Sequence, residues 1–127
     1  MMRDKIEISV IIPIYNEEST CNEIINKVKS VNLVKEIIVV DDASTDSTFE
    51  ILKRIDDINI IKHSSNIGKG AAVRTGLNHV NYDYVITQDA DLEYYPEDYY
   101  MLAKAMNEYR VKAVSYTHLT LPTKRIV

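Results

Sequence analysis

The chain has 127 residues, 46% of them hydrophobic and 27% charged, and a formal net charge of -4 at pH 7. This length allows one domain at most, and the composition is that of a folded chain and not of a disordered one. The negative charge argues against nucleic acid as a partner, since its phosphates require a basic face. Cys21 is the single cysteine, which excludes an internal disulfide and a cysteine-based zinc site.

The beginning of the chain, residues 1–7, is charged where a signal peptide needs an apolar core. No apolar run reaches the roughly 18 residues that a membrane helix requires. We therefore expect a cytoplasmic location, with contact to the cytoplasmic face of a membrane only in a longer parent protein.

The first predicted strand is residues 6–14, a nearly continuous run of β-branched residues of the kind that is buried on both faces. A helix is expected next, with Asn16 as its cap. Its apolar positions recur at helical spacing: Cys21, Ile24, Ile25 and Val28. Residues 36–40 predict the second strand, and Ser47 with Glu50 forms a capping box for a second helix.

The second half of the chain repeats this alternation. Residues 58–62 predict a third strand, residues 63–68 a loop and residues 84–87 a fourth strand. Helical spacing relates three apolar residues of the intervening segment: Val73, Leu77 and Val80. A last helix is expected near Pro96. Four strands alternating with four helices predict an α/β fold with three αβα layers and a mostly parallel sheet.

Polar residues gather where the predicted strands end, which is where ligands bind in such sheets. Tyr15 follows the first strand and offers a ring that can lie against a nucleobase, or else it is a half-buried core tyrosine. Asp41 and Asp42 follow the second strand, and we expect one carboxylate to face the ligand while the other turns away. A carboxylate there accepts hydrogen bonds from a base imide or a ribose hydroxyl, although the same residues also suit a turn.

The loop before the third helix combines glycines with a lysine, in the sequence Asn66-Ile67-Gly68-Lys69-Gly70. Its glycines allow backbone N–H groups to approach an anion, and Lys69 adds a positive charge. The loop is neither the dinucleotide-binding fingerprint nor a P-loop, because the required glycine spacing and the Lys-Ser/Thr ending are absent. We therefore expect a general anion contact here.

Asp89 and Asp91 stand one residue apart just beyond the fourth strand. This spacing brings two hard oxygen ligands to one side of an extended segment, which suits Mg²⁺ or Mn²⁺, and Glu93 is placed to reach the same ion. The alternative is a solvated turn. A group of tyrosines follows, which either lines a sugar or acceptor site or packs against the rest of the protein: Tyr94, Tyr95, Tyr99 and Tyr100.

Taken in order, these motifs resemble those of the family two glycosyltransferases, in the branch related to dolichyl-phosphate mannosyltransferase and bacterial polyprenyl-phosphate glycosyltransferases. The resemblance covers residues 8–109. It rests on four segments: VIIPIYNE (10–17), VVDDASTD (39–46), NIGKGAAVRTG (66–76) and DADLE (89–93). Four motifs in the right order are more specific than any one of them.

The resemblance implies a nucleotide-diphospho-sugar transferase fold of the GT-A type. It implies that five residues hold the nucleoside of a UDP- or GDP-linked sugar donor: Pro13, Tyr15, Glu17, Val40 and Asp42. Asp89, Ala90 and Asp91 would hold the diphosphate and the metal. The two aspartates would thereby contribute to catalysis, because the metal stabilises charge on the leaving diphosphate. Glu93 stands where the mannosyltransferase branch has a glutamine or similar residue, so it either tightens the metal site or only lies near it.

The resemblance also implies inversion at the anomeric carbon and a polyprenyl phosphate or a saccharide as acceptor. No catalytic base is identifiable, and an anionic lipid phosphate needs none. Two alternatives stay open. One is a phosphate-receiver signalling domain, although receivers place their acidic pair after the first strand and not the second. The other is a chain that binds nucleotide without catalysis.

The end of the chain, residues 114–127, reads VSYTHLTLPTKRIV, without clear periodicity and without an acidic residue. It resembles one reading frame of the transposase adapter used in short-read DNA library preparation. We therefore expect a sequencing artefact that should be left out of fold reasoning, the alternative being a natural strand and turn. On this interpretation residues 1–113 are the N-terminal, nucleotide-sugar-binding part of a truncated domain.

Overall fold

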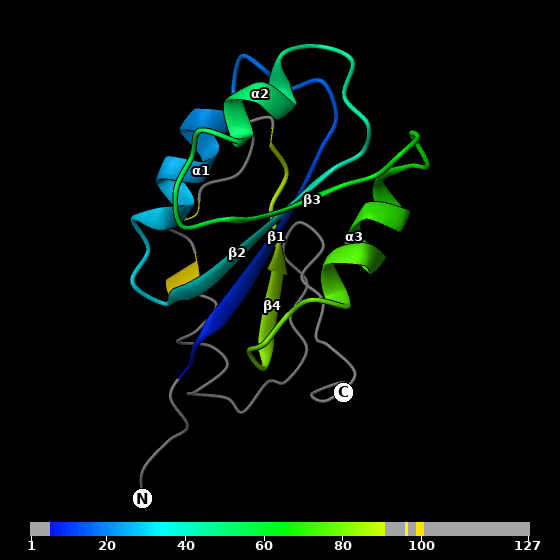
Figure 1. Ribbon diagram of the computed structural model, residues 1–127. Helices are drawn as coiled ribbons and strands as arrows, with labels where there is room; N and C mark the ends of the chain where they lie inside the picture. The colour runs from blue at the N-terminus through cyan, green and yellow to red at the C-terminus, as the bar shows by residue number, and fades with distance from the viewer. Residues whose placement is uncertain (1–5, 91–95, 97–98, 101–127) are drawn as a thin grey trace, which may run out of the picture.

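A four-stranded parallel sheet forms the centre of the computed structural model, which describes residues 6–90, 96 and 99–100. The strands are β1 (Ile8–Ile14), β2 (Val34–Asp41), β3 (Asn59–Lys62) and β4 (Tyr84–Thr87). Their order is β3-β2-β1-β4, and every neighbouring pair is parallel (Figure 1). The predicted parallel sheet is confirmed. Because the chain leaves β1 toward β2 and β3 and then returns to β4 on the other side, the strand order reverses at β1.

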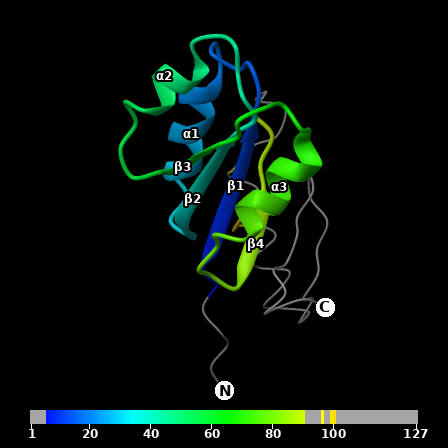
Figure 2. The ribbon, with the colours of Figure 1, turned by 45° about the vertical axis from the view of Figure 1, so that its right-hand side comes forward.

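Helices cover both faces of this sheet. α1 (Cys21–Lys29) and α2 (Thr48–Leu52) lie on one face, and α3 (Lys69–Leu77) lies on the other (Figures 1 and 2). The strand side chains alternate between two apolar clusters, so that Ile12 and Val39 face α1 while Ile11 and Val40 face α3. The predicted three-layer arrangement is therefore confirmed, and the four apolar residues expected on α1 are all buried.

The third helix packs on the sheet through small residues. Its buried residues are Ala72 and Gly76, whereas the predicted contacts Val73, Leu77 and Val80 are only partly buried. A Cβ added at Gly76 would lie 2.6 Å from Cγ2 of Ile11, a fully buried residue of β1. The backbone of α3 therefore lies closer to the sheet than a larger residue at this position would allow.

Of the two predicted helix caps, Asn16 is wrong and Ser47 is confirmed in position only. Asn16 does not cap α1, which begins after Thr20; Asn16 instead has a φ of 53° and bonds to another loop. Ser47 does precede α2, but its side chain makes no cap hydrogen bond. Asp46 provides a bond nearby, because its Oδ1 accepts a 2.9 Å hydrogen bond from the backbone N–H of Thr48. Burial raises the pKa of Asp46, but hydrogen bonds from Thr48 and the Glu18 backbone outweigh this and lower it.

The predicted last helix falls mostly outside the described residues, as do Tyr94 and Tyr95. Tyr99 is fully buried in the cluster beneath α1, and its hydroxyl donates to Oε1 of Gln88. Tyr100 is 43% exposed, and its hydroxyl accepts a 2.8 Å hydrogen bond from the Asn32 backbone. In the part of the chain that the structure describes, no helix has the length and apolar character to cross a membrane.

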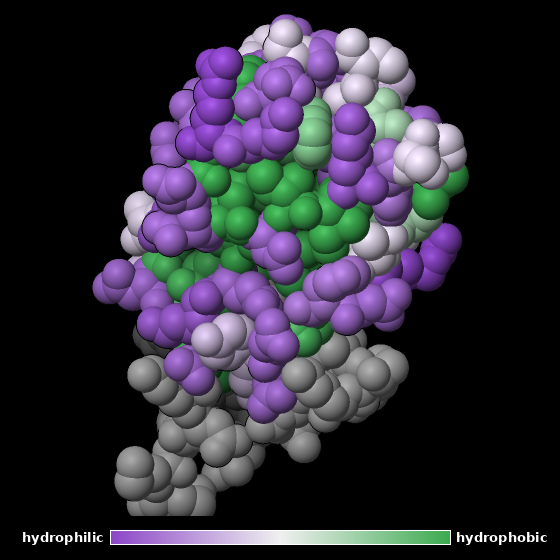
Figure 3. Space-filling model, in the orientation of Figure 1, coloured by the Kyte–Doolittle hydropathy of each residue, from purple (hydrophilic) through white to green (hydrophobic). Residues whose placement is uncertain are grey.

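Strand β3 lies at the edge of the sheet and is covered less completely than its neighbours. Three apolar side chains on or beside it are only partly buried: Ile58, Ile60 and Ile61. Figure 3 shows an apolar area at the centre of one face of the molecule, with polar side chains around it. Apolar area of this kind is common on folded domains and does not by itself indicate a partner.

Candidate functional site

A pocket opens at the carboxyl edge of the sheet, beside the reversal of strand order. Its walls come from the ends of β1, β2 and β4 and from the beginning of α3. They comprise Pro13, Ile14, Tyr15, Glu17, Asp42, Lys69, Ala72, Asp89 and Ala90. The structure thus brings together every predicted site residue that it describes except Val40, which is fully buried in the cluster beneath α3. Asp91 and Glu93 lie outside the described residues.

The end of β1 presents Tyr15 to the pocket with 44% of its surface exposed. The next residue, Asn16, fastens the loop after β2 to this strand end: its Oδ1 accepts a 2.7 Å hydrogen bond from Thr45 N, and its own N–H donates to Ser44 Oγ at 2.9 Å. Asparagine tolerates the positive φ that this arrangement requires better than most residues. The ring of Tyr15 is therefore exposed on a backbone that is held in place.

Asp42 is 4% exposed, and protein groups bond to both of its oxygens. Oδ1 faces His63 Nδ1 at 2.8 Å and accepts from Ile67 N at 3.0 Å, while Oδ2 accepts from Gly68 N at 2.8 Å. Burial raises the pKa of Asp42, but the hydrogen bonds from His63, Ile67 and Gly68 lower it by more, so its pKa lies below the ordinary value. This carboxylate is ionised and fixed in position.

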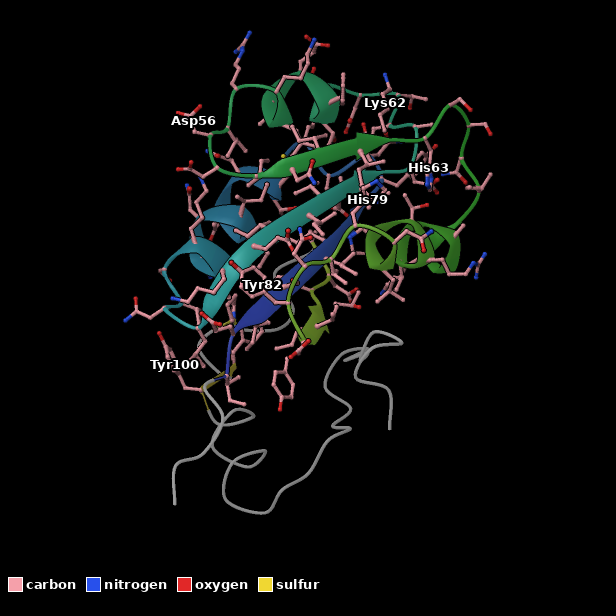
Figure 4. All side chains as sticks on the ribbon, turned by 60° about the horizontal axis from the view of Figure 1, so that its bottom comes forward. Asp56, Lys62, His63, His79, Tyr82 and Tyr100 are labelled. Atoms are coloured by element: carbon pink, nitrogen blue, oxygen red, sulfur yellow. The ribbon has the colours of Figure 1, made fainter. Side chains whose placement is uncertain are left out.

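His63 extends the network from Asp42 to α3. It follows β3 and lies beside α3 (Figure 4). Because an ionised carboxylate only accepts, Nδ1 of His63 must donate to Asp42. Its Nε2 lies 2.8 Å from Oγ1 of Thr75 on α3. Sequence reasoning missed His63, although a polar residue directly after the third strand matches the pattern that identified Tyr15, Asp42 and Asp89.

The loop at residues 66–68 does bring backbone N–H groups to an anion, as its glycine suggested. That anion is the carboxylate of Asp42, which takes the N–H groups of Ile67 and Gly68. Gly68 adopts a φ of 103°, which few other residues tolerate. Lys69 follows as the first residue of α3 and is the residue of this loop region that lines the pocket.

Asp89 is bound to Lys69 through an ion pair between its Oδ1 and the lysine Nζ. Exposed fractions are 46% for the Lys69 side chain and 18% for that of Asp89. The turn that carries Asp89 is fixed through its backbone. Nε2 of Gln88 donates to the carbonyl of Asp89 at 3.2 Å, and the hydroxyl of Thr20 donates to the carbonyl of Ala90 at 2.7 Å. Thr20 and Gln88 also escaped sequence reasoning, since hydroxyl and amide side chains are too common to single out.

Asp41 and Asp42 point in different directions, as expected for consecutive residues at a strand end. Oδ1 of Asp41 accepts from the backbone and the hydroxyl of Ser44, at 3.0 and 2.6 Å. Its Oδ2 is buried and has no hydrogen-bond partner among the described residues. Asp41 does not line the pocket, so of the two carboxylates only Asp42 faces it.

The described residues contain no group of three or more side chains able to hold a metal ion. Asp89 is the predicted ligand among them. Its carboxylate is partly exposed in the pocket and already attracts a cation, the ammonium of Lys69, and carboxylate oxygens are the ligands that Mg²⁺ and Mn²⁺ prefer. The described part of the site therefore offers one oxygen ligand of the kind that a divalent cation takes.

Solved structures with the same fold are GT-A glycosyltransferases, and this is the class that the fold defines. The mannosyltransferase PcManGT of Pyrobaculum calidifontis, solved with GDP-Man and Mn²⁺, is 29% identical with a TM-score of 0.62, over 67% of this chain and 27% of its own. Glucosyl-3-phosphoglycerate synthase of Mycobacterium tuberculosis was solved with Mn²⁺, UDP and glucosyl-3-phosphoglycerate. It is 30% identical with a TM-score of 0.67, and the match covers 80% of this chain and 39% of that protein.

The chain belongs to glycosyl transferase family 2, whose family model matches residues 9–120. It is 34% identical over 110 residues to undecaprenyl-phosphate 4-deoxy-4-formamido-L-arabinose transferase of Edwardsiella ictaluri, covering 80% of this chain and 34% of that protein. The protein of the same name from Salmonella choleraesuis is 37% identical over 101 residues, covering 72% and 31%. The chain thus spans about a third of the length of these relatives. The phosphate-receiver alternative is not supported.

Proposed function

We propose that the chain forms the donor-binding part of a glycosyltransferase that uses a UDP- or GDP-linked sugar with Mg²⁺ or Mn²⁺. The observation that carries this proposal is the pocket, where an exposed aromatic ring, a fixed carboxylate and a lysine–aspartate pair line one cavity. An aromatic ring suits a nucleobase, a carboxylate suits a base imide or a ribose hydroxyl, and a cation suits a diphosphate.

The nucleoside end of the donor is assigned to the side of the pocket formed by β1 and β2. Tyr15 offers the exposed face of its ring for stacking, and Asp42 lies in the same pocket. Three of the carboxylate's acceptor positions are used by protein donors, which leaves capacity for one further hydrogen bond. Pro13 and Glu17 line the same side, whereas Val40 supports it from within the core.

The diphosphate and metal end is assigned to Lys69 and to the turn after β4. Asp89, Asp91 and Glu93 would hold the cation, with Ala90 between the two aspartates. The cation, when bound, stabilises the negative charge that develops on the leaving diphosphate. Thr20 and Gln88 hold the backbone of this turn, which keeps Asp89 at the mouth of the pocket.

The acceptor is proposed to be a polyprenyl phosphate, with inversion at the anomeric carbon. Support comes from the names of the relatives, which are transferases of undecaprenyl phosphate. A phosphate acceptor is anionic, so it can attack without a protein base. A polyprenyl lipid resides in a membrane, so we place the parent enzyme at the cytoplasmic face of one.

The test is calorimetric titration of the 127-residue chain with UDP and with GDP, each in the presence of Mn²⁺ and of a chelator. One nucleotide is expected to bind only with Mn²⁺. Asp89→Asn should weaken that binding at least about 100-fold, because even partners outside the direct ligands cost 10–100-fold when removed from a metal site. Asp91→Ala should do the same.

Asp56→Asn is the matched control, because Asp56 is an exposed aspartate beside β3 and does not line the pocket (Figure 4). It should bind as the unmodified chain does. Equal nucleotide binding with the chelator, or unchanged binding by Asp89→Asn, would show that the metal assignment is wrong.

A further inference from the structure

Lys69 and Asp89 form the ion pair at the mouth of the pocket, and they come from different elements. Lys69 is the first residue of α3, and Asp89 follows the end of β4. Among the described residues, Nζ of Lys69 is the one group that bonds to the carboxylate of Asp89. The carboxylate that the proposed function assigns to a divalent cation is therefore in contact, through its Oδ1, with the protein's own ammonium group.

A divalent cation and the ammonium of Lys69 compete for this oxygen. Two positive charges at one carboxylate oxygen repel each other strongly, because the pocket screens charge less well than bulk water. Lys69 must therefore leave Oδ1 of Asp89 before a metal ion can use that oxygen, and its ammonium also repels a metal ion at Oδ2. The pair is suited to such an exchange, since 46% of the Lys69 side chain is exposed and ion pairs this open are weak.

A diphosphate in the pocket would give Lys69 somewhere else to bind. The N–H groups of Ile67 and Gly68 are occupied by Asp42, so these two donors are not available to a phosphate. Lys69 directly follows these residues and lines the pocket on a flexible four-carbon stem. Its ammonium is the one cationic side-chain group among the described residues that line the pocket, and it suits a phosphate.

We propose that Lys69 couples metal binding to nucleotide binding. Without nucleotide, its ammonium holds Asp89 and opposes the metal. When a nucleoside diphosphate enters, Lys69 transfers to the phosphate, and Asp89 becomes available to the cation. Metal and nucleotide therefore bind cooperatively, and each raises the affinity for the other by the same factor. This proposal rests on the proposed function and adds an order to it: the cation binds well only together with the nucleotide.

The test measures the affinity of the 127-residue chain for Mn²⁺, by electron paramagnetic resonance of the free ion, alone and with saturating UDP or GDP. The unmodified chain should bind Mn²⁺ at least about tenfold more tightly with nucleotide, a typical coupling between two sites. Lys69→Met should bind Mn²⁺ alone about fivefold more tightly than the unmodified chain, the factor expected for removing an exposed ion pair. The gain in Mn²⁺ affinity that nucleotide gives this variant should be about fivefold smaller than the gain in the unmodified chain, because the contact between the cation and the diphosphate remains.

Two further variants test whether the positive charge at position 69 is what matters, and whether loss of any exposed lysine has the same effect. Lys69→Arg keeps the charge and should restore weak binding of Mn²⁺ alone. Lys53→Met removes an exposed lysine that pairs with Glu50 on the opposite side of the sheet, and it should behave as the unmodified chain. The same response to Lys53→Met as to Lys69→Met would overturn the proposal.

The outcomes also separate this proposal from the function on which it rests. If the unmodified chain binds neither UDP nor GDP in a metal-dependent way, the proposed function is wrong. If it does bind one of them, but Lys69→Met binds Mn²⁺ alone no more tightly than the unmodified chain, the proposed function stands and the coupling role of Lys69 is refuted. If Lys69→Arg binds Mn²⁺ alone as tightly as Lys69→Met does, the coupling role is refuted as well.

Discussion

Asp42 and Asp89 both follow strands at one edge of the sheet, but they differ in exposure and in hydrogen-bond partners. Asp42 is 4% exposed, and its oxygens are bonded by a histidine and two backbone N–H groups. The side chain of Asp89 is 18% exposed and bonded by one flexible lysine. The first carboxylate is fixed by the fold, and the second is left exchangeable. A buried anion with several fixed donors shapes a site, whereas one with a single mobile partner is available to a ligand.

The largest expected effect follows from removing each carboxylate in turn. Asp42→Ala leaves His63 and the N–H groups of Ile67 and Gly68 without their acceptor, so we expect it to lower the free energy of unfolding by about 3 kcal/mol. Asp89→Ala removes only an open ion pair, so it should cost less than about 1 kcal/mol. Urea denaturation of both variants measures the difference. Equal losses would mean that Asp42 is no more important to the fold than Asp89.

A second effect is the pH dependence of stability that Asp42 confers. The folded state lowers the pKa of Asp42 below its ordinary value of 3.8, because the hydrogen bonds it accepts outweigh its burial. Its stabilising contribution is therefore complete above that value and is lost as the pH falls through the lower, folded-state pKa. We expect a gap of about 2 kcal/mol in unfolding free energy between the unmodified chain and Asp42→Asn at pH 7.

The gap should close as the pH falls below 3.8, because protonated aspartate and asparagine are both neutral. Denaturation curves for both proteins between pH 7 and pH 2.5 provide the measurement. A gap that stays constant across this range would show that the charge of Asp42 does not contribute.

The smallest expected effects concern two threonines, each of which bonds to a neighbour of one of the two carboxylates. Thr20 donates to the carbonyl of Ala90, and Thr75 lies against His63. Thr20→Val and Thr75→Val should each lower the free energy of unfolding by about 1 kcal/mol, the usual contribution of one hydrogen bond. Only Thr20→Val should also weaken Mn²⁺ binding in the presence of nucleotide, by about threefold. A similar loss in Thr75→Val would contradict the separation of the two regions.

The strands and the position of the site were predictable because they depend on patterns that are local in sequence. Residues 84–87 match β4 without error, and the other predicted strands differ from the structure by one or two residues at their ends. Polar residues directly after the strands pointed to one edge of the sheet. Tyr15, Asp42, Lys69 and Asp89 do meet there, because parallel strands bring their carboxyl ends together.

Partners across the pocket could not be predicted, because they depend on which loops the fold brings together. The sequence around Asn16 suits a helix cap equally well, and its bonds to residues 44–46 arise only once β1 and β2 are paired. The hydrogen bonds that Ile67 and Gly68 donate to Asp42 likewise join two loops that are distant in sequence. The pairing of Lys69 with Asp89 requires α3 to pack on β1 and β2 and β4 to pair with β1. No spacing rule encodes these contacts.

Gly76 has a consequence beyond packing. A side chain at this position would press on Ile11, which is fully buried and has no room to move. The helix would have to shift as a rigid rod, and its first residue, Lys69, would shift with it. The position of Lys69 relative to Asp89 thus depends on Gly76, which lies two helical turns away and has no functional group. A substitution at Gly76 would change the distance between Lys69 and Asp89 and leave every chemical group of the site in place.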